Sequence, residues 1–231
     1  MKNKVLPILL TFIFSISMSY AQVDSVLVCD VKFENSKFNN PHAGSGFILK
    51  YNNKLYGITA KHVLFFAKTD CMGTISFNGE LKSWHFASKK NLENKVEAGN
   101  LVNENKSEEI IMPPKGDWLI FEIKGGVPKD IALYFLRNKP LNMGESVYFL
   151  GYPYKNKKPI KVVGSFIGHT QEGNLKLDVP KGNYGGCSGG PVVDSEGKLV
   201  GIVSMGYFNE KENKMVFEPA SLDYLKTVIK P

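Results

Sequence analysis

The chain has 231 residues, of which 43% are hydrophobic and 22% are charged, and its formal net charge is +7. This composition excludes a disordered chain, because enough apolar surface can be buried to offset the entropy lost on folding. Arg137 is the only arginine, and nucleic-acid recognition commonly uses arginine as well as lysine. We therefore expect one ordinary domain or two small barrels, with no nucleic-acid partner.

The first 21 residues have the pattern of a secretory signal peptide. Lys2 and Lys4 give a basic start, residues 5–18 are mostly apolar, and Ala21 ends a small-residue cleavage site. The apolar run is short for a membrane span, and an uncleaved anchor is the alternative reading. Cleavage after Ala21 removes two positive charges and no negative one. We expect an exported protein, secreted or periplasmic, with no stable membrane insertion after cleavage.

Cysteine usage indicates no metal site. The three cysteines are Cys29, Cys71 and Cys187, and no two have the spacing of a zinc motif. An odd number cannot all pair within one chain. In an oxidising compartment Cys29 and Cys71 form the expected disulfide, a pairing that the sequence does not establish.

Short apolar runs between turn residues predict a protein built mainly from β-strands. The 22 glycines and 12 prolines fit frequent turns. Strands are expected at residues 25–33, 47–49, 55–59, 118–123, 132–136, 144–151, 160–167, 175–179, 191–193, 199–203 and 215–219. A short helix is expected at 222–229, with Ser221 as its cap. Residues 91–109 are polar and lack periodicity, so we expect a surface excursion there.

The most informative segment is a glycine-rich loop at residues 185–191, with the sequence GGCSGGP. Two apolar runs separated by a turn follow it and predict a β-hairpin. Glycines let backbone N–H groups approach a ligand, because no Cβ intervenes. Ser188, held among such donors, can act as a nucleophile whose oxyanion the loop stabilises. A flexible turn is the alternative reading of the glycine content alone.

Two upstream residues have the settings that such a serine requires. His62 directly follows a predicted strand, and an imidazole can accept and return a proton near neutral pH. Asp117 opens a strongly apolar strand, where a partly buried carboxylate needs a partner such as an imidazolium. Taken singly, His62 fits a strand cap and Asp117 fits a strand-initiating turn. His42, His85 and His169 lack the context of His62 and are interpreted as surface or loop residues.

In the order His62, Asp117, Ser188, these residues resemble the triad of the chymotrypsin-like, or trypsin-fold, serine proteases. Residues 59–62 read TAKH, similar to the family's Thr-Ala-x-His, and residues 186–191 match its Gly-x-Ser-Gly-Gly-Pro. The resemblance covers nearly all of residues 40–230 and implies an all-β fold of two antiparallel six-stranded β-barrels with a short C-terminal helix. A barrel at 22–125 would carry the histidine and aspartate, and a barrel at 126–231 would carry the serine.

The resemblance also implies the role of each residue. Ser188 would attack a peptide carbonyl, His62 would accept and return the proton, and Asp117 would orient the imidazole. The backbone N–H groups of Gly186 and Ser188 would form the oxyanion hole. No cofactor or metal is implied. The implied partner is a protein or peptide substrate, and the oligomeric state is not predicted.

The resemblance implies a role in substrate binding for Gly182, Ser204 and Gly206. Gly182 stands six residues before Ser188, at the position where members that cleave after Lys or Arg carry an aspartate. We therefore expect an uncharged residue at P1, the substrate residue on the amino side of the scissile bond. Ser204 is also expected to form a hydrogen bond with Asp117.

Cys187 marks a departure from the family's animal members, which carry an aspartate there that pairs with a newly formed N-terminus. We expect that activation switch to be absent and bacterial-type members to be closer. Cys187 as the nucleophile is disfavoured, since Ser188 directly precedes Gly-Gly.

The leading prediction is a secreted serine endopeptidase. One alternative is a catalytically silent binding protein on the same scaffold. An esterase would need a strand–turn–helix elbow in place of the hairpin.

Overall fold

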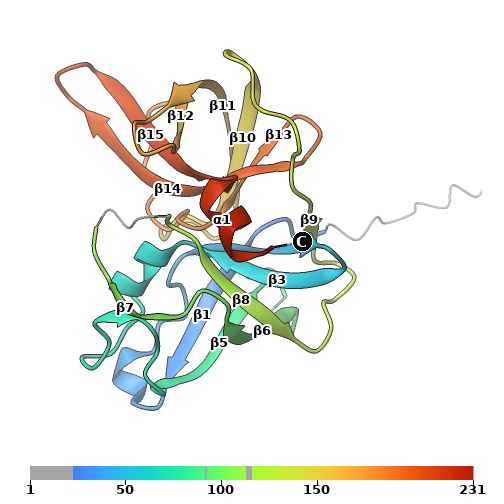
Figure 1. Ribbon diagram of the computed structural model, residues 1–231, viewed down its shortest axis with the longest axis vertical. Coiled ribbons are helices and arrows are strands. Elements are labelled where there is room, and N and C mark those ends of the chain that lie inside the picture. The colour runs from blue at the N-terminus through green and yellow to red at the C-terminus, as the bar shows by residue number, and fades with distance from the viewer. Residues whose placement is uncertain (1–22, 92, 113–115, 231) are drawn as a thin grey trace, which may run out of the picture.

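The computed structural model describes residues 23–91, 93–112 and 116–230. Its strands form two barrels, which lie one above the other in Figure 1, with the first half of the chain below. The predicted signal peptide at residues 1–21 lies outside the described residues. Within the described ranges, no helix has the length and apolar character needed to cross a membrane.

Six described strands close the first barrel. They are β1 (Leu27–Phe33), β2 (Ser45–Tyr51), β3 (Lys54–Thr59), β5 (Leu81–Ala87), β6 (Lys95–Leu101) and β8 (Leu119–Lys124). Their order is β1-β5-β6-β8-β3-β2, and antiparallel pairing of β1 with β2 completes the circle. Strand β4 (Thr74–Ile75) pairs with β7 (Asn105–Glu109) as a separate ribbon.

The second barrel is antiparallel and nearly closed. Its strands are β10 (Ser146–Gly151), β11 (Ile160–His169), β12 (Leu175–Asp178), β13 (Pro191–Asp194), β14 (Leu199–Asn209) and β15 (Lys214–Ser221). The order is β12-β11-β10-β13-β14-β15, and among the described residues no ladder joins the two outer strands. The predicted all-β fold of two six-stranded barrels with one short C-terminal helix is confirmed.

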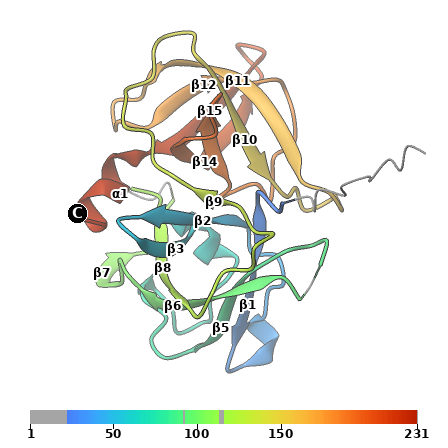
Figure 2. The ribbon, with the colours of Figure 1, turned by 90° about the vertical axis from the view of Figure 1, so that its right-hand side faces the viewer.

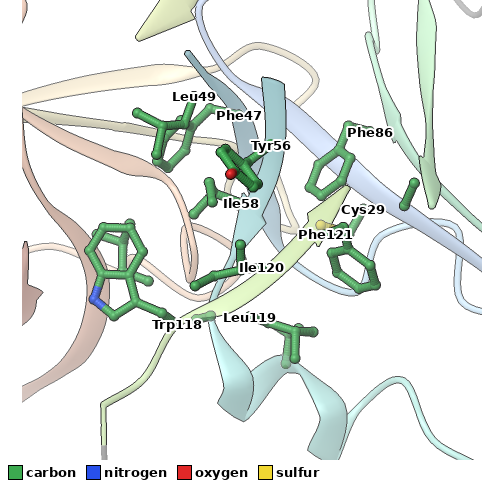
Figure 3. Close-up of a cluster of buried hydrophobic side chains, with 14 of the residues drawn as sticks. Cys29, Phe47, Leu49, Tyr56, Ile58, Phe86, Trp118, Leu119, Ile120 and Phe121 are labelled. Carbon is green, nitrogen blue, oxygen red and sulfur yellow. The ribbon is translucent and has the colours of Figure 1, made fainter. Parts of the chain in front are cut away.

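Apolar side chains from several strands fill the first barrel. Phe47 and Leu49 of β2, Ile58 of β3 and Ile120 of β8 are each at most 1% exposed. Figure 3 shows these side chains in one cluster with the neighbouring aromatic rings. Burying a side chain of this size contributes roughly 1.5–3 kcal/mol. The resulting core holds the ends of β3 and β8 in fixed positions, and the site is built on those ends.

Two later elements also belong to the first barrel. Strand β9 (Leu133–Tyr134) pairs in parallel with β2, and Figure 2 shows the two side by side. Helix α1 (Leu222–Val228) buries Leu222 and Leu225 in the cluster that contains the core of that barrel and also includes Val193 and Ile202 of the second barrel. Both elements follow residue 126: β9 comes before the second barrel in the chain, and α1 comes after it. The proposed division at residues 125 and 126 stays a prediction.

The helix begins where it was expected but is not capped as predicted. Ser221 precedes α1, yet its side chain makes no capping hydrogen bond to the backbone. Its hydroxyl lies 3.4 Å from Asp223 Oδ2 instead. The backbone oxygen of Ser221 accepts a 2.8 Å hydrogen bond from Trp118 Nε1. This bond ties the start of the helix to the first barrel.

The polar segment 91–109 was wrongly predicted to be an irregular excursion. It contains β6, in which Val96 and Ala98 are buried while Lys95 and Glu97 are exposed, and it also contains β7. The alternation is present but short, and small or charged residues occupy most positions. Pairing with β5 and β8 stabilises β6 as a strand despite its low apolar content.

The predicted disulfide is also wrong, because Cys29 and Cys71 are both free. Cys29 lies in β1, fully buried, and its Sγ is 3.7 Å from the backbone oxygen of Ser45. Cys71 is exposed in the loop after the first-barrel 3-10 turn η2 (Lys61–Phe65). One thiol faces the core and the other faces solvent, so the pairing inferred from cysteine number fails.

Candidate active site

Adjacent strands of the first barrel bring His62 and Asp117 together. His62 lies in η2, just after β3 ends at Thr59, and Asp117 lies just before β8 begins at Leu119. Thr59 is the pairing partner of Leu119. Because β3 and β8 are antiparallel, the end of one meets the start of the other, and both side chains lie at the same end of the barrel.

Asp117 holds His62 at two points. Its Oδ1 accepts the backbone N–H of His62 at 2.9 Å, and its Oδ2 lies 2.6 Å from His62 Nδ1. Asp117 is 3% exposed and His62 is 5% exposed. A carboxylate beside Nδ1 favours the tautomer that carries its proton there. The other ring nitrogen, Nε2, is then left to act as a base.

A third hydrogen bond reaches Asp117 from the second barrel. Ser204 Oγ, in β14, donates to Asp117 Oδ2 at 2.5 Å, so the predicted contact is confirmed. Two donors on Oδ2 and one on Oδ1 satisfy a carboxylate that is almost fully removed from water. Because all three hydrogen bonds are formed, the negative charge of Asp117 can remain buried beside the imidazole of His62.

Ser188 lies between β12 and β13, in a loop that is tied to both barrels. Its backbone oxygen accepts a 2.8 Å hydrogen bond from the N–H of Ser45 in β2. The next residue, Gly189, donates to Val203 O at 2.8 Å. Within the described part of the chain, Ser188 Oγ has no hydrogen-bond partner, so its contact with His62 is not formed. Such contacts are often long until a substrate binds.

Two positions in this loop require glycine. Gly186 has φ +98°, and a Cβ there would lie 2.6 Å from the backbone oxygen of Tyr152. Gly189 has φ +82°, and a Cβ there would lie 2.2 Å from Thr59 Oγ1. Larger residues are excluded by both the backbone conformation and the lack of space. The glycine pattern therefore reflects the packing of the loop against both barrels.

The loop presents two unused backbone donors. Among the described residues, the N–H groups of Gly186 and Ser188 have no acceptor, whereas the N–H of Cys187 between them donates to Tyr184 O at 2.9 Å. N–H groups at alternate positions of a tight loop, without internal partners, are available to a negatively charged oxygen. These are the two residues that the sequence predicted for an oxyanion hole.

A pocket of about 390 Å³ lies beside Ser188. The residues predicted to bind substrate, Gly182, Ser204 and Gly206, all line it. Its other lining residues are mostly apolar or aromatic and include Tyr184, Val203, Tyr207, Phe208, Met215 and Phe217. None of the lining residues is charged. The pocket is suited to an uncharged side chain, since an unpaired charge would lose its hydration there.

Cys187 is unsuited to act as the nucleophile. It is fully buried, and burial raises the pKa of its thiol to about 12. A Cβ at Gly151 would lie 2.5 Å from the Cβ of Cys187, so the side chain is closely packed against β10. The thiol stays protonated at neutral pH, and the thiolate is the reactive form.

Sequence analysis missed Ser45, which contacts the serine loop from the first barrel. It is fully buried, and its hydroxyl donates to Gly186 O at 2.8 Å. The available signal was the sequence Gly-Ser-Gly at residues 44–46, at the start of β2, the strand that pairs with β3. A polar residue between glycines at the start of an apolar strand needs a buried partner.

The chain matches the trypsin-like peptidase domain family over residues 44–202. It belongs to that family. Membership confirms the resemblance to trypsin-fold serine proteases that the sequence motifs indicated. A comparison with curated proteins found no match.

Solved structures share the fold at low sequence identity. The serine endoprotease from Yersinia pestis has a TM-score of 0.59 and 18% identity, and the match covers 90% of this chain and 62% of that one. The HtrA-type protease AlgW, solved with a decapeptide, has a TM-score of 0.58 and 17% identity, covering 90% and 64%. The chain therefore spans less than two thirds of either protein, and the likeness concerns the fold.

Proposed function

We propose that the protein is an exported serine endopeptidase that cleaves peptide bonds through Ser188, His62 and Asp117. The observation that carries the proposal is the buried pair of Asp117 and His62, joined at 2.6 and 2.9 Å. The pair belongs to a fold in which a glycine loop places Ser188 beside a pocket. The unused N–H groups of Gly186 and Ser188 support the same chemistry.

In the proposed reaction, Ser188 Oγ attacks the carbonyl carbon of the peptide bond and passes its proton to His62 Nε2. The carbonyl oxygen becomes an oxyanion, which accepts hydrogen bonds from the N–H groups of Gly186 and Ser188. Loss of one such donor typically costs on the order of 3 kcal/mol in the barrier. Asp117 stabilises the imidazolium that forms.

Collapse of this intermediate breaks the carbon–nitrogen bond. His62 donates its proton to the leaving amine, and an acyl ester remains on Ser188. A water molecule then attacks the ester while His62 again accepts a proton. The second tetrahedral intermediate collapses to release the carboxylic acid and restores the hydroxyl of Ser188.

The proposed substrate is a protein or peptide chain with an uncharged P1 residue. The uncharged lining of the pocket beside Ser188 supports this choice. The structural neighbour AlgW was solved with a decapeptide, which supports a peptide ligand for the shared fold. The basic and apolar pattern of residues 1–21 supports export to the periplasm or the exterior.

A silent binding protein is the second candidate, and one observation favours it. Within the described residues, Ser188 Oγ has no hydrogen bond to His62. The two candidates are separated by incubating the purified protein and Ser188→Ala with denatured casein and following new N-termini by mass spectrometry. We expect cleavage by the wild type alone. Binding of casein without cleavage by either protein would favour the silent scaffold.

A further inference from the structure

Ser45 connects the first barrel to both residues of the proposed oxyanion hole. Its hydroxyl donates to Gly186 O at 2.8 Å, and its backbone N–H donates to Ser188 O at 2.8 Å. The same hydroxyl accepts the N–H of Tyr152 at 2.9 Å. Ser45 is fully buried, so water cannot replace these bonds. One residue of β2 therefore contacts the loop at two points, on either side of Cys187.

The backbone of Ser45 is itself held in place. Its carbonyl oxygen accepts a hydrogen bond from Thr59 Oγ1 at 2.7 Å, and Thr59 is the last residue of β3, the strand that leads to His62. The residue that holds the serine loop is thus attached to the strand that places the base. Both connections lie within the first barrel, whereas the loop belongs to the second.

Gly186 depends on such external contacts for its orientation. It has no side chain, and its φ of +98° is one that glycine can leave at little cost. The carbonyl before it, of Gly185, accepts the N–H of Tyr154 at 2.9 Å, and its own carbonyl accepts the hydroxyl of Ser45. These two bonds fix the peptide planes on both sides of the Gly186 Cα. Without the bond from Ser45, the plane between Gly186 and Cys187 keeps only the bond from the Cys187 N–H to Tyr184 O at 2.9 Å.

We propose that Ser45 is a positioning residue for the oxyanion hole. Its hydroxyl and N–H hold Gly186 and Ser188 so that their own N–H groups face the developing negative charge. The proposal rests on the proposed peptidase function. Without the hydroxyl, Gly186 O and the N–H of Tyr152 both lose a buried partner. Turning of the Gly186–Cys187 peptide to recover a partner for Gly186 O would move the Gly186 Cα, and with it the Gly186 N–H that faces the oxyanion.

The test compares the wild type with Ser45→Ala in the rate of labelling by a fluorophosphonate, whose phosphoryl oxygen takes the place of the oxyanion. Both the limiting rate and the half-saturating probe concentration are measured. We expect Ser45→Ala to lower the limiting rate on the order of 10- to 100-fold, since small displacements of a reacting group cost this much. The half-saturating concentration should change less than about twofold, because the pocket keeps its lining.

Two further variants separate positioning from general destabilisation. Ser45→Cys retains a weak donor, so its limiting rate should fall between those of wild type and Ser45→Ala. Ser76→Ala removes another buried hydroxyl, which donates to Glu104 Oε1 at 2.5 Å within the first half of the chain. It should label at the wild-type rate. Melting temperatures of all variants are measured alongside.

The outcomes distinguish this proposal from the proposed function. If the wild type labels and Ser45→Ala labels at the same limiting rate, the positioning role is wrong and the peptidase function stands. Equal losses of rate in Ser76→Ala and Ser45→Ala would also contradict it, since general destabilisation would then account for both. Absence of labelling in the folded wild type would overturn both proposals together.

Discussion

Ser204 Oγ donates a hydrogen bond to Asp117 Oδ2 over 2.5 Å, although the two residues are 87 positions apart and belong to different barrels. Ser204 also lines the pocket beside Ser188. The strand that shapes the pocket is therefore bonded to the carboxylate that holds His62. In the proposed reaction, substrate binding along this strand and the orientation of His62 are therefore physically connected.

The first prediction concerns Asp117→Asn. The substitution keeps the size of the side chain but offers an amide, which can favour the wrong tautomer of His62. We expect kcat for peptide hydrolysis to fall about 10⁴-fold, because an imidazole held in the wrong tautomer cannot accept the proton of Ser188, with KM changed little. Ser204→Ala, which removes one of three donors to the carboxylate, should cost roughly tenfold. A full rate in Asp117→Asn would contradict the assigned role.

The second prediction concerns the thiols. Cys29 and Cys187 are fully buried and burial raises each pKa to about 12, while Cys71 is exposed. A chromogenic disulfide reagent at pH 8 should therefore react with one thiol in the folded protein and with all three after denaturation. Cys71→Ser should remove the fast thiol. If Cys29 and Cys71 formed a disulfide, the folded protein would show none and the denatured protein one.

The third prediction concerns specificity at P1. The pocket has no charged lining residue, so a charged P1 side chain would lose hydration without gaining a partner. In a peptide library, cleavage after uncharged residues should exceed cleavage after Lys, Arg, Asp or Glu by roughly tenfold or more. Met215→Asp places a carboxylate in the lining and should raise the share of cleavage after Lys. Predominant cleavage after charged residues by the wild type would refute the assignment.

The fourth prediction concerns stability at acid pH. Burial is the larger cause and the positive charge of Lys89 the smaller cause that lowers the pKa of His42 to about 4. Lys89 Nζ lies 3.0 Å from His42 Nδ1. A histidine in the unfolded chain titrates near 6.5. Between these values the unfolded state binds the proton more tightly, so stability is lost as the pH falls through this window.

His42→Gln removes that titration. Between pH 7 and pH 4.5, the melting temperature of the wild type should fall further than that of His42→Gln, by about 3–6 °C. The comparison cancels the titration of groups that the two proteins share. Equal falls in the melting temperatures of the two proteins, measured by circular dichroism, would show that folding does not lower the pKa of His42.

The local parts of the site could be predicted from the sequence. His62, Asp117 and Ser188 each lie next to a strand end, and short motifs mark those ends. Ser45 was not recognised, because its partner Gly186 is 141 positions away, and the surrounding Gly-Ser-Gly sequence indicates a buried polar residue without indicating that partner. The hydrogen bond from Ser204 to Asp117 was predictable from the resemblance, since Ser204 lies in β14, the second strand of the hairpin that follows the serine loop.

The missed fold elements have physical reasons as well. Strand β6 has few apolar residues and is stabilised mainly by its pairing with β5 and β8. Its apolar alternation in the sequence was therefore too weak to indicate a strand. The pairing of Cys29 with Cys71 was inferred from cysteine number and compartment, which carry no information on distance. The folded positions of the two thiols, one in the core and one at the surface, depend on the whole barrel.

Active-site labelling by a fluorophosphonate probe tests most directly whether Ser188 is an activated nucleophile. We expect one label per chain, which peptide mass spectrometry should locate on Ser188. Ser188→Ala should not label. His62→Ala should label more slowly than the wild type by a factor on the order of 10⁴ or greater. Cys187→Ala should still label. No labelling of the folded wild type, or a signal that depends on Cys187 and survives in Ser188→Ala, would show that Ser188 is not the nucleophile.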